Sequence, residues 1–422
     1  LNQPSFLYPR NNKPDFVAVP GKHITGTPAY TILFVSSQHH ILFKKGTGSN
    51  GIVLFYLYFC PKHKINHMKQ DRVVFLDYLR IFACFLVMMV HASEAFYGGG
   101  DVPILSETHK LWIAVWDGMS RISVPLFVIT SAYLLVPMKE NQSWGEFFKR
   151  RFLRILPPMI VFMVIYAVLP VWQEGGSWKE MCIAVCKLPL NFPMNAFHLW
   201  FMYPLIGLYL FIPILSPWLR TATAKQERMF LYLWALTTCL PFVNKFYGDV
   251  LGQCWWNQYY MLYDFSGYPG YLVLGHYIRY HIDWSRLKRS VVGLACLLCG
   301  TSFTILSFYL QAKPGTPQQL ADLEIAWCFC IINCVIATFG AFLLFTTIRK
   351  EGRAYSLVKS ISVNSYGMFL MHLLWLPLWF SVVQPQTSVA VAIPLVSALT
   401  FVSCYLTTKL ISYLPGSKWV IG

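Results

Sequence analysis

The chain has 422 residues, of which 56% are hydrophobic and only 12% charged, and its mean hydropathy is +0.48. Soluble globular proteins rarely have this composition, and several apolar windows of about 20 residues indicate a polytopic membrane protein instead. The formal net charge of +16 would suggest nucleic acid in a soluble chain, but here the basic residues lie in short loops between apolar runs. We therefore expect a lipid bilayer, and no nucleic acid, as their partner.

Residues 1–67 do not share the apolar pattern of the rest of the chain. They contain no Met, and their apolar run is too short to span a membrane. The first methionine is Met68. We expect residues 1–67 to be a non-native or disordered N-terminal extension, and residues 68–422 to form a single membrane domain.

From Met68 onward the sequence predicts an all-α polytopic membrane fold with about ten transmembrane helices. Lys and Arg support this count, because every loop rich in basic residues falls on the same side when the spans alternate. Both termini are then cytoplasmic. The predicted spans are 73–96, 111–136, 154–173, 198–217, 229–243, 260–279, 290–310, 325–347, 361–381 and 389–411.

The first predicted span carries four residues that hydrocarbon disfavours, Asp77, Arg80, His91 and Glu94. At about 100° per residue they fall within an arc of roughly 100°, so they share one face of a helix. Three charges at mid-bilayer would cost on the order of 8–10 kcal/mol, while the apolar residues of the span return only about 4–7 kcal/mol. We therefore expect this face to contact protein or a watery cavity.

The spacing on this face suggests a function. Arg80 and His91 lie eleven positions apart, about 16 Å along the axis, so they mark two depths, with Arg80 toward the cytoplasm. A lone membrane histidine is usually a structural contact, but four polar residues on one arc favour a site. We interpret His91 as a general base, with Glu94 holding its ring and stabilising the imidazolium.

The same residues carry a resemblance to a known family. Arg80 and His91 form an R-x10-H pattern in a first transmembrane helix, and from Asp71 to the C-terminus the chain resembles the acyltransferase-3 family of membrane O-acyltransferases. The version with Arg121 is most similar to the branch that O-acetylates surface polysaccharides, and Ala132 stands where that family usually has Gly. Stretches 121–134, 150–158, 198–201 and 365–372 resemble further family motifs.

The resemblance implies acyl-CoA as donor, with acetyl-CoA the most frequent in the family. Arg150, Arg151 and Arg154 cluster where the third span begins, and they are candidates for binding the phosphates of coenzyme A. Ordinary positive-inside anchoring is the alternative for this cluster. Arg80 would position the donor or stabilise developing negative charge.

Three more residues are candidates for binding the acceptor. Arg121 lies inside the second span, where it either orients an acyl carbonyl or pairs with Glu94 or Asp117, and pairing is favoured. His198, at the outer end of the fourth span, is a candidate for contacting the acceptor, although interfacial histidines are common. His372, in mid-span, is open between packing and lining a site.

The sequence thus predicts an O-acetyltransferase of the bacterial inner membrane that moves an acetyl group from acetyl-CoA to a hydroxyl of a cell-envelope glycan or its lipid-linked sugar precursor. The alternative is a transporter or flippase for a glycan or small solute, which would use intramembrane charges as a pathway. No stretch resembles a P-loop, a zinc site or a haem pocket, so we expect no metal or redox cofactor.

Overall fold

The computed structural model describes residues 30–34, 41–45, 72–97, 103–189, 194–248, 259–316 and 323–422. The chain divides into two units, residues 1–71 and 72–422. In the first, β1 (Tyr30–Phe34) and β2 (Ile41–Lys45) pair antiparallel. The rest of the predicted N-terminal extension lies outside the described residues, so the expectation for residues 1–67 stays a prediction.

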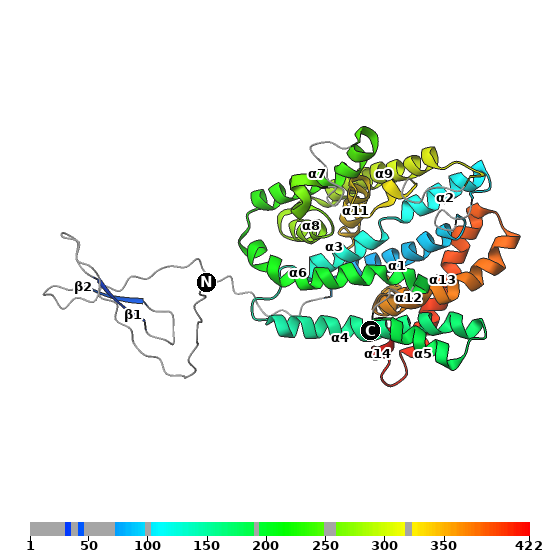
Figure 1. Ribbon diagram of the computed structural model, residues 1–422. Helices are drawn as coiled ribbons and strands as arrows, with labels where there is room; N and C mark the ends of the chain where they lie inside the picture. The colour runs from blue at the N-terminus through cyan, green and yellow to red at the C-terminus, as the bar shows by residue number, and fades with distance from the viewer. Residues whose placement is uncertain are drawn as a thin grey trace, which may run out of the picture. The chain divides into compact units, whose positions relative to one another are not determined.

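The described part of the second unit consists of helices (Figure 1). The α-helices are α1 (Val74–Glu94), α2 (Glu107–Ser120), α3 (Ser123–Leu135), α4 (Trp144–Gln173), α5 (Trp178–Lys187), α6 (Met202–Thr221), α7 (Ala224–Tyr247), α8 (Pro269–His281), α9 (Arg286–Gln311), α11 (Ile332–Phe345), α12 (Tyr355–Val383), α13 (Val389–Ile411) and α14 (Lys418–Ile421), and the 3₁₀ helices are η2 (Met194–Phe201), η3 (Tyr260–Phe265), η4 (Glu324–Trp327) and η5 (Gln384–Gln386).

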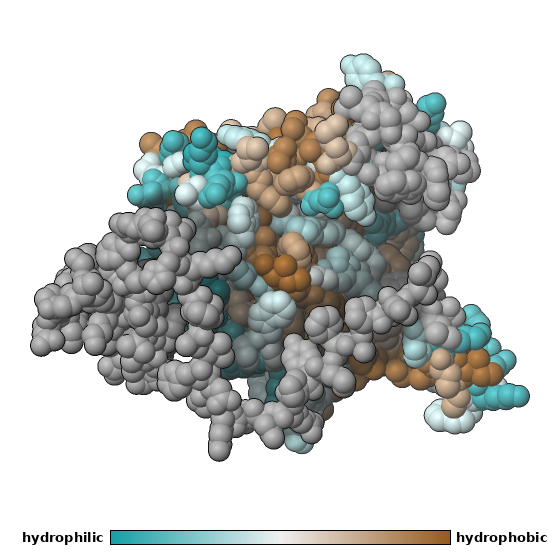
Figure 2. Space-filling model, turned by 60° about the vertical axis from the view of Figure 1, so that its left-hand side comes forward, coloured by the Kyte–Doolittle hydropathy of each residue, from teal (hydrophilic) through white to brown (hydrophobic). Residues whose placement is uncertain are grey.

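Eight helical segments among the described residues are long and apolar enough to cross a membrane, which confirms the all-α polytopic fold class. Figure 2 shows apolar side chains over much of the middle of the face that it presents. Two of the ten predicted spans are not among the eight. Span 229–243 lies within α7, and span 260–279 is divided between η3 and α8. The count of ten and the cytoplasmic termini stay predictions.

The helix of the third span begins ten residues before its predicted start. Ser143 caps it, because its side chain accepts a hydrogen bond from the backbone N–H of Glu146 at 3.2 Å. The basic residues of this stretch therefore lie on the first turns of a helix. Their spacing on that helix decides which of them face the protein.

The second predicted span is not one continuous helix. It breaks between α2 and α3, at Arg121 and Ile122. The carbonyl oxygen of Arg121 accepts a hydrogen bond from the thiol of Cys334 at 3.3 Å. A broken helix inside a membrane is tolerated where its free backbone groups are satisfied by neighbouring protein, as this carbonyl is.

Helix α1 is surrounded by other helices. It packs against α2, α3, α12 and α13 (Figure 1). Its polar face is therefore directed at protein and at the cavities between helices.

Helices α9 and α11 approach closely through glycine. A Cβ atom on Gly300 would lie 2.4 Å from the carbonyl oxygen of Asn333, and one on Gly340 would lie 2.4 Å from the backbone nitrogen of Leu297. Because these neighbours are backbone atoms, they cannot move aside without moving a helix. Small residues at such crossings are typical of helix pairs in membranes.

Candidate functional site

The polar face of α1 begins with a carboxylate that holds the helix in place. Asp77 is 1% exposed and accepts two hydrogen bonds from Arg72, at 2.5 and 2.8 Å. It also accepts hydrogen bonds at 2.7 Å from the hydroxyls of Tyr355 and Ser362. The bond to Asp77 raises the pKa of Arg72 above its ordinary value. Asp77 therefore joins the start of α1 to α12.

Arg80 has only a distant contact with this carboxylate. Its guanidinium lies 3.7 Å from Oδ1 of Asp77, because the oxygens of Asp77 already accept bonds from Arg72, Tyr355 and Ser362. The guanidinium of Arg80 is therefore free to face a ligand and not only Asp77. It borders a cavity of about 400 Å³, which we call the inner cavity.

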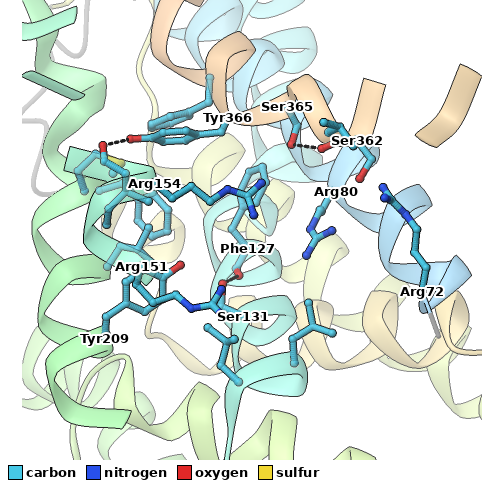
Figure 3. Close-up of a pocket in the computed structure, with 18 residues that line it drawn as sticks. Arg72, Arg80, Phe127, Ser131, Arg151, Arg154, Tyr209, Ser362, Ser365 and Tyr366 are labelled. Atoms are coloured by element: carbon cyan, nitrogen blue, oxygen red, sulfur yellow. Dashed lines mark hydrogen bonds between the residues drawn. The ribbon is translucent and has the colours of Figure 1, made fainter. Parts of the chain in front are cut away.

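The inner cavity is strongly basic. Arg72, Arg80, Arg151 and Arg154 line it, and no Asp or Glu is among the described residues that do. Figure 3 shows the guanidinium groups of Arg80, Arg151 and Arg154 directed into one space from α1 and α4. Such a concentration of guanidinium groups without carboxylates fits a polyanionic ligand such as a phosphate ester.

Arg151 carries a buried donor that suits an anionic ligand. Its Nε atom is buried and has no hydrogen-bond partner in the described part of the chain. A buried donor without an acceptor is costly, and an anion in the cavity would satisfy it. Arg150, the third member of the predicted cluster, does not line the cavity. It is exposed and pairs with Glu146 at 2.5 Å.

The remaining walls of the inner cavity are of two kinds. Hydroxyl groups lie near the arginines, and apolar side chains cover the rest. The hydroxyl-bearing residues are Ser131, Tyr209, Ser362, Ser365 and Tyr366, and the apolar residues are Phe127, Leu134, Leu135, Ile155, Phe201, Met202, Leu205, Val363 and Phe369. A ligand with a charged end and a less polar chain matches these walls.

A second cavity, of about 210 Å³, lies farther along α1, and we call it the outer cavity. His91 and Glu94 line it from the last turn of α1. Nδ1 of His91 lies 2.7 Å from Oε2 of Glu94. This contact fixes the ring and leaves Nε2 as the nitrogen available for a proton transfer, as in the orienting pair of a catalytic triad.

The pair belongs to a longer row of charges. The guanidinium of Arg121 donates to Glu94 at 3.2 Å and to both oxygens of Asp117, at 2.6 and 2.8 Å. It also lies 4.1 Å from the ring centre of Trp327. The predicted pairing of Arg121 with Glu94 or Asp117 is thus present with both. Two carboxylates and one guanidinium leave one negative charge, which an imidazolium at His91 would neutralise.

Two further histidines lie beside His91. The ring of His372 stacks on that of His91 at 5.1 Å and lies 4.7 Å from that of His198, measured between centroids. His198 lines the outer cavity, whereas His372 is fully buried behind it and lines neither cavity. One nitrogen on each, Nδ1 of His198 and Nε2 of His372, has no partner in the described residues.

The two cavities meet at a pair of aromatic rings. Phe201 and Phe369 line both cavities, and both side chains are buried. We call them the phenylalanine pair. Sequence reasoning missed them, because a phenylalanine in an apolar span looks like ordinary core. Their place in the stretches 198–201 and 365–372, each three residues from His198 or His372, was the signal that could have found them.

Comparison with known proteins gives a family for the chain. A family model described as an acyltransferase domain matches residues 73–409. No curated protein and no solved structure matches. The matched range contains both cavities except for Arg72.

Proposed function

The chain belongs to the acyltransferase family whose model matches residues 73–409, and from this premise we propose that it moves an acetyl group from acetyl-CoA to a hydroxyl of a cell-envelope glycan or its lipid-linked precursor. It is a multi-pass membrane protein. The observation that carries the proposal is the meeting of a carboxylate-free arginine cavity with a His–Glu cavity at the phenylalanine pair. One cavity suits a donor with phosphates and the other suits a hydroxyl acceptor.

The donor binds in the inner cavity in this proposal. Arg80, Arg151 and Arg154 contact the phosphates of coenzyme A, and an anion there satisfies Nε of Arg151. The cavity lies on the side that the positive-inside rule assigns to the cytoplasm, where acetyl-CoA is made. The chain that bears the thioester then extends past the phenylalanine pair.

The acceptor hydroxyl binds in the outer cavity. Nε2 of His91 takes the hydroxyl proton while the oxygen attacks the acetyl carbonyl carbon, and the carbon–sulfur bond breaks as the ester forms. The proton on His91 passes to the departing thiolate, so the products are the acetylated sugar and free coenzyme A. The carboxylates of Glu94 and Asp117 stabilise the transient imidazolium by charge, and Arg121, which donates to both of them, holds them in place.

The family favours this function over transport of an unmodified solute. We also propose that the protein lies in a bacterial inner membrane, because a cytoplasmic donor and an envelope acceptor meet there. No metal enters this reaction scheme.

The test uses the full chain in vesicles with acetyl-CoA labelled in its acetyl group. We expect label to reach envelope glycan or its lipid-linked precursor, and to stay on acetyl-CoA when His91 is replaced by Ala. A protein that moves glycan across the vesicle membrane without acetylating it would overturn the proposal. Comparing the envelope polysaccharide of cells with and without the gene identifies the acetylated sugar.

A further inference from the structure

A polar cluster lies between α7 and α8, among residues that line neither cavity. Glu227 extends from α7 toward two histidines of α8. Its Oε2 lies 3.0 Å from Nδ1 of His276, and its Oε1 lies 2.8 Å from Nε2 of His281. One ligand atom from each of the three residues lies within 4.8 Å of the other two.

The cluster is held by tight packing of the two helices. Gly270 of α8 lies against the indole of Trp234, where an added Cβ would lie 2.0 Å from a ring carbon. The indole nitrogen of Trp234 also donates to the carbonyl of Gly267 at 2.9 Å. Glu227 and Trp234 are seven positions apart on α7, about two turns, so they lie on one face of the helix. This contact fixes Glu227 against α8.

The charge of Glu227 needs compensation. The residue is fully buried, and an ionised carboxylate in that setting is costly unless it is paired. The nearest cations in sequence on the two helices bind elsewhere in the described structure. Arg228 donates to the hydroxyl of Tyr277 at 3.2 Å, and Arg279 donates to the carbonyl of Tyr133 at 2.6 Å. The ion-pair contacts of Glu227 in the described residues are those with His276 and His281.

We propose that Glu227, His276 and His281 bind one divalent transition-metal ion, with Zn²⁺ as the ion that suits them best. Two imidazoles and one carboxylate are a common zinc donor set, with a water in the fourth position. Zinc lies about 2.0–2.2 Å from such donors, so in a tetrahedral site the donor atoms are roughly 3.4 Å apart. The contacts of 3.0 and 2.8 Å use different oxygens of Glu227, and one ligand atom from each residue lies within 4.8 Å of the other two, so the three side chains must adjust to reach this spacing.

The structure indicates how an ion reaches this site and what its binding does to the two helices. The side chain of His281 is 23% exposed, so an ion and its water can enter from that side. Binding would replace the direct contacts between carboxylate and imidazole, and it would link α7 to α8. Neither helix is among the eight apolar spans, so this pair has more to gain from such a link. The role is structural, because the cluster borders neither cavity.

The test is zinc binding by the whole protein, purified in detergent without a polyhistidine tag and stripped with a chelator. We expect the wild type to bind about one zinc per chain after gel filtration, measured by elemental mass spectrometry. Glu227→Gln and His281→Gln should each weaken binding at least tenfold. His109→Gln, which removes a histidine from α2, should bind like the wild type.

Thermal unfolding gives an independent measurement. Zinc should raise the unfolding midpoint of the wild type and of His109→Gln, and it should leave that of Glu227→Gln unchanged. If Glu227→Gln fails to fold, His281→Gln decides, because its side chain is the most exposed of the three. A wild type that binds no zinc, or a His281→Gln protein that binds it equally well, overturns the proposal. Neither outcome bears on acetyl transfer.

Discussion

Phe201 and Phe369 pack edge to face between the two cavities, with ring centroids 6.3 Å apart and planes at 82°. Arg80 borders the cavity on one side of them, and His91 borders the cavity on the other. These two residues are eleven positions apart, about 16 Å along α1. In the proposed reaction, an acyl group that leaves the arginines must therefore pass two aromatic rings before it reaches the histidine.

Removing one of these two phenylalanine rings should change which acyl groups are transferred. In Phe369→Ala, the space left by the ring should raise transfer of butyryl relative to acetyl groups several-fold, measured with the two labelled donors side by side. Phe148→Ala is the control, because Phe148 stacks on Phe152 and lines neither cavity. An unchanged ratio in Phe369→Ala would show that the pair does not select the acyl group.

Replacing the histidine of the outer cavity should stop the reaction without unfolding the protein. His91→Ala should lower the rate of acetyl transfer by about 10²–10⁴-fold, the range for loss of a general base. Glu94→Gln should lose less, because an amide still holds the ring but brings no charge. Transfer rates are compared at equal amounts of folded protein. His109→Ala serves as control, and retained activity in His91→Ala would remove this residue from the mechanism.

The arginines of α4 should differ in their effect on the donor. Arg151→Gln and Arg154→Gln should each raise KM for acetyl-CoA tenfold or more, about 1.4 kcal/mol, since a charged contact with phosphate is lost. Arg150→Gln should leave KM unchanged, because Arg150 pairs with Glu146 outside the inner cavity. Equal effects at all three positions would point to general attraction by the basic surface.

The close contact of α9 and α11 predicts that a larger residue at Gly300 lowers the free energy of unfolding. Gly300→Ala should lower the free energy of unfolding by about 1–3 kcal/mol, because the added methyl group meets backbone atoms of α11. The midpoint of thermal unfolding in detergent measures the change. Gly145→Ala is matched to it, since nothing lies within 4 Å of the added Cβ. A stable Gly300→Ala protein would mean that the two helices can separate easily.

Much of the fold could be predicted from the sequence, because a bilayer imposes a length and a composition on each span. Eight of the ten predicted spans correspond to apolar helical segments that meet those limits, one of them broken between α2 and α3. Span 260–279 did not form one helix, since Gly267 takes a left-handed conformation with φ +79° and separates η3 from α8. The break beside Ile122 has a signal in Pro125, which has no N–H to donate to the carbonyl of Arg121, but the partner that this carbonyl finds, Cys334, is 213 positions away.

The site was predictable where it follows one helix. The helical period placed Arg80 at one depth and His91 with Glu94 at another, and the structure gives each depth its own cavity. It was harder to predict which of the adjacent arginines lines the inner cavity. Arg150 and Arg151 differ by about 100° around α4, and only the neighbouring helices decide which one is covered. The Glu227 cluster joins residues 49 and 54 positions apart, a separation with no periodic signal.

Helix α12 carries both a ring that lines the two cavities and the histidine that stacks on His91. Phe369, which lies between the cavities, and His372, which stacks on His91, are three residues apart and thus share a face. Asp77 ties the same helix to α1 through Ser362 and Tyr355. A rotation of α12 that draws Phe369 aside would therefore also move His372 off the ring of His91, which Glu94 continues to hold. Admission of the acyl group and a change in the packing of the base would then be one movement, which would limit hydrolysis of the donor while the passage is closed.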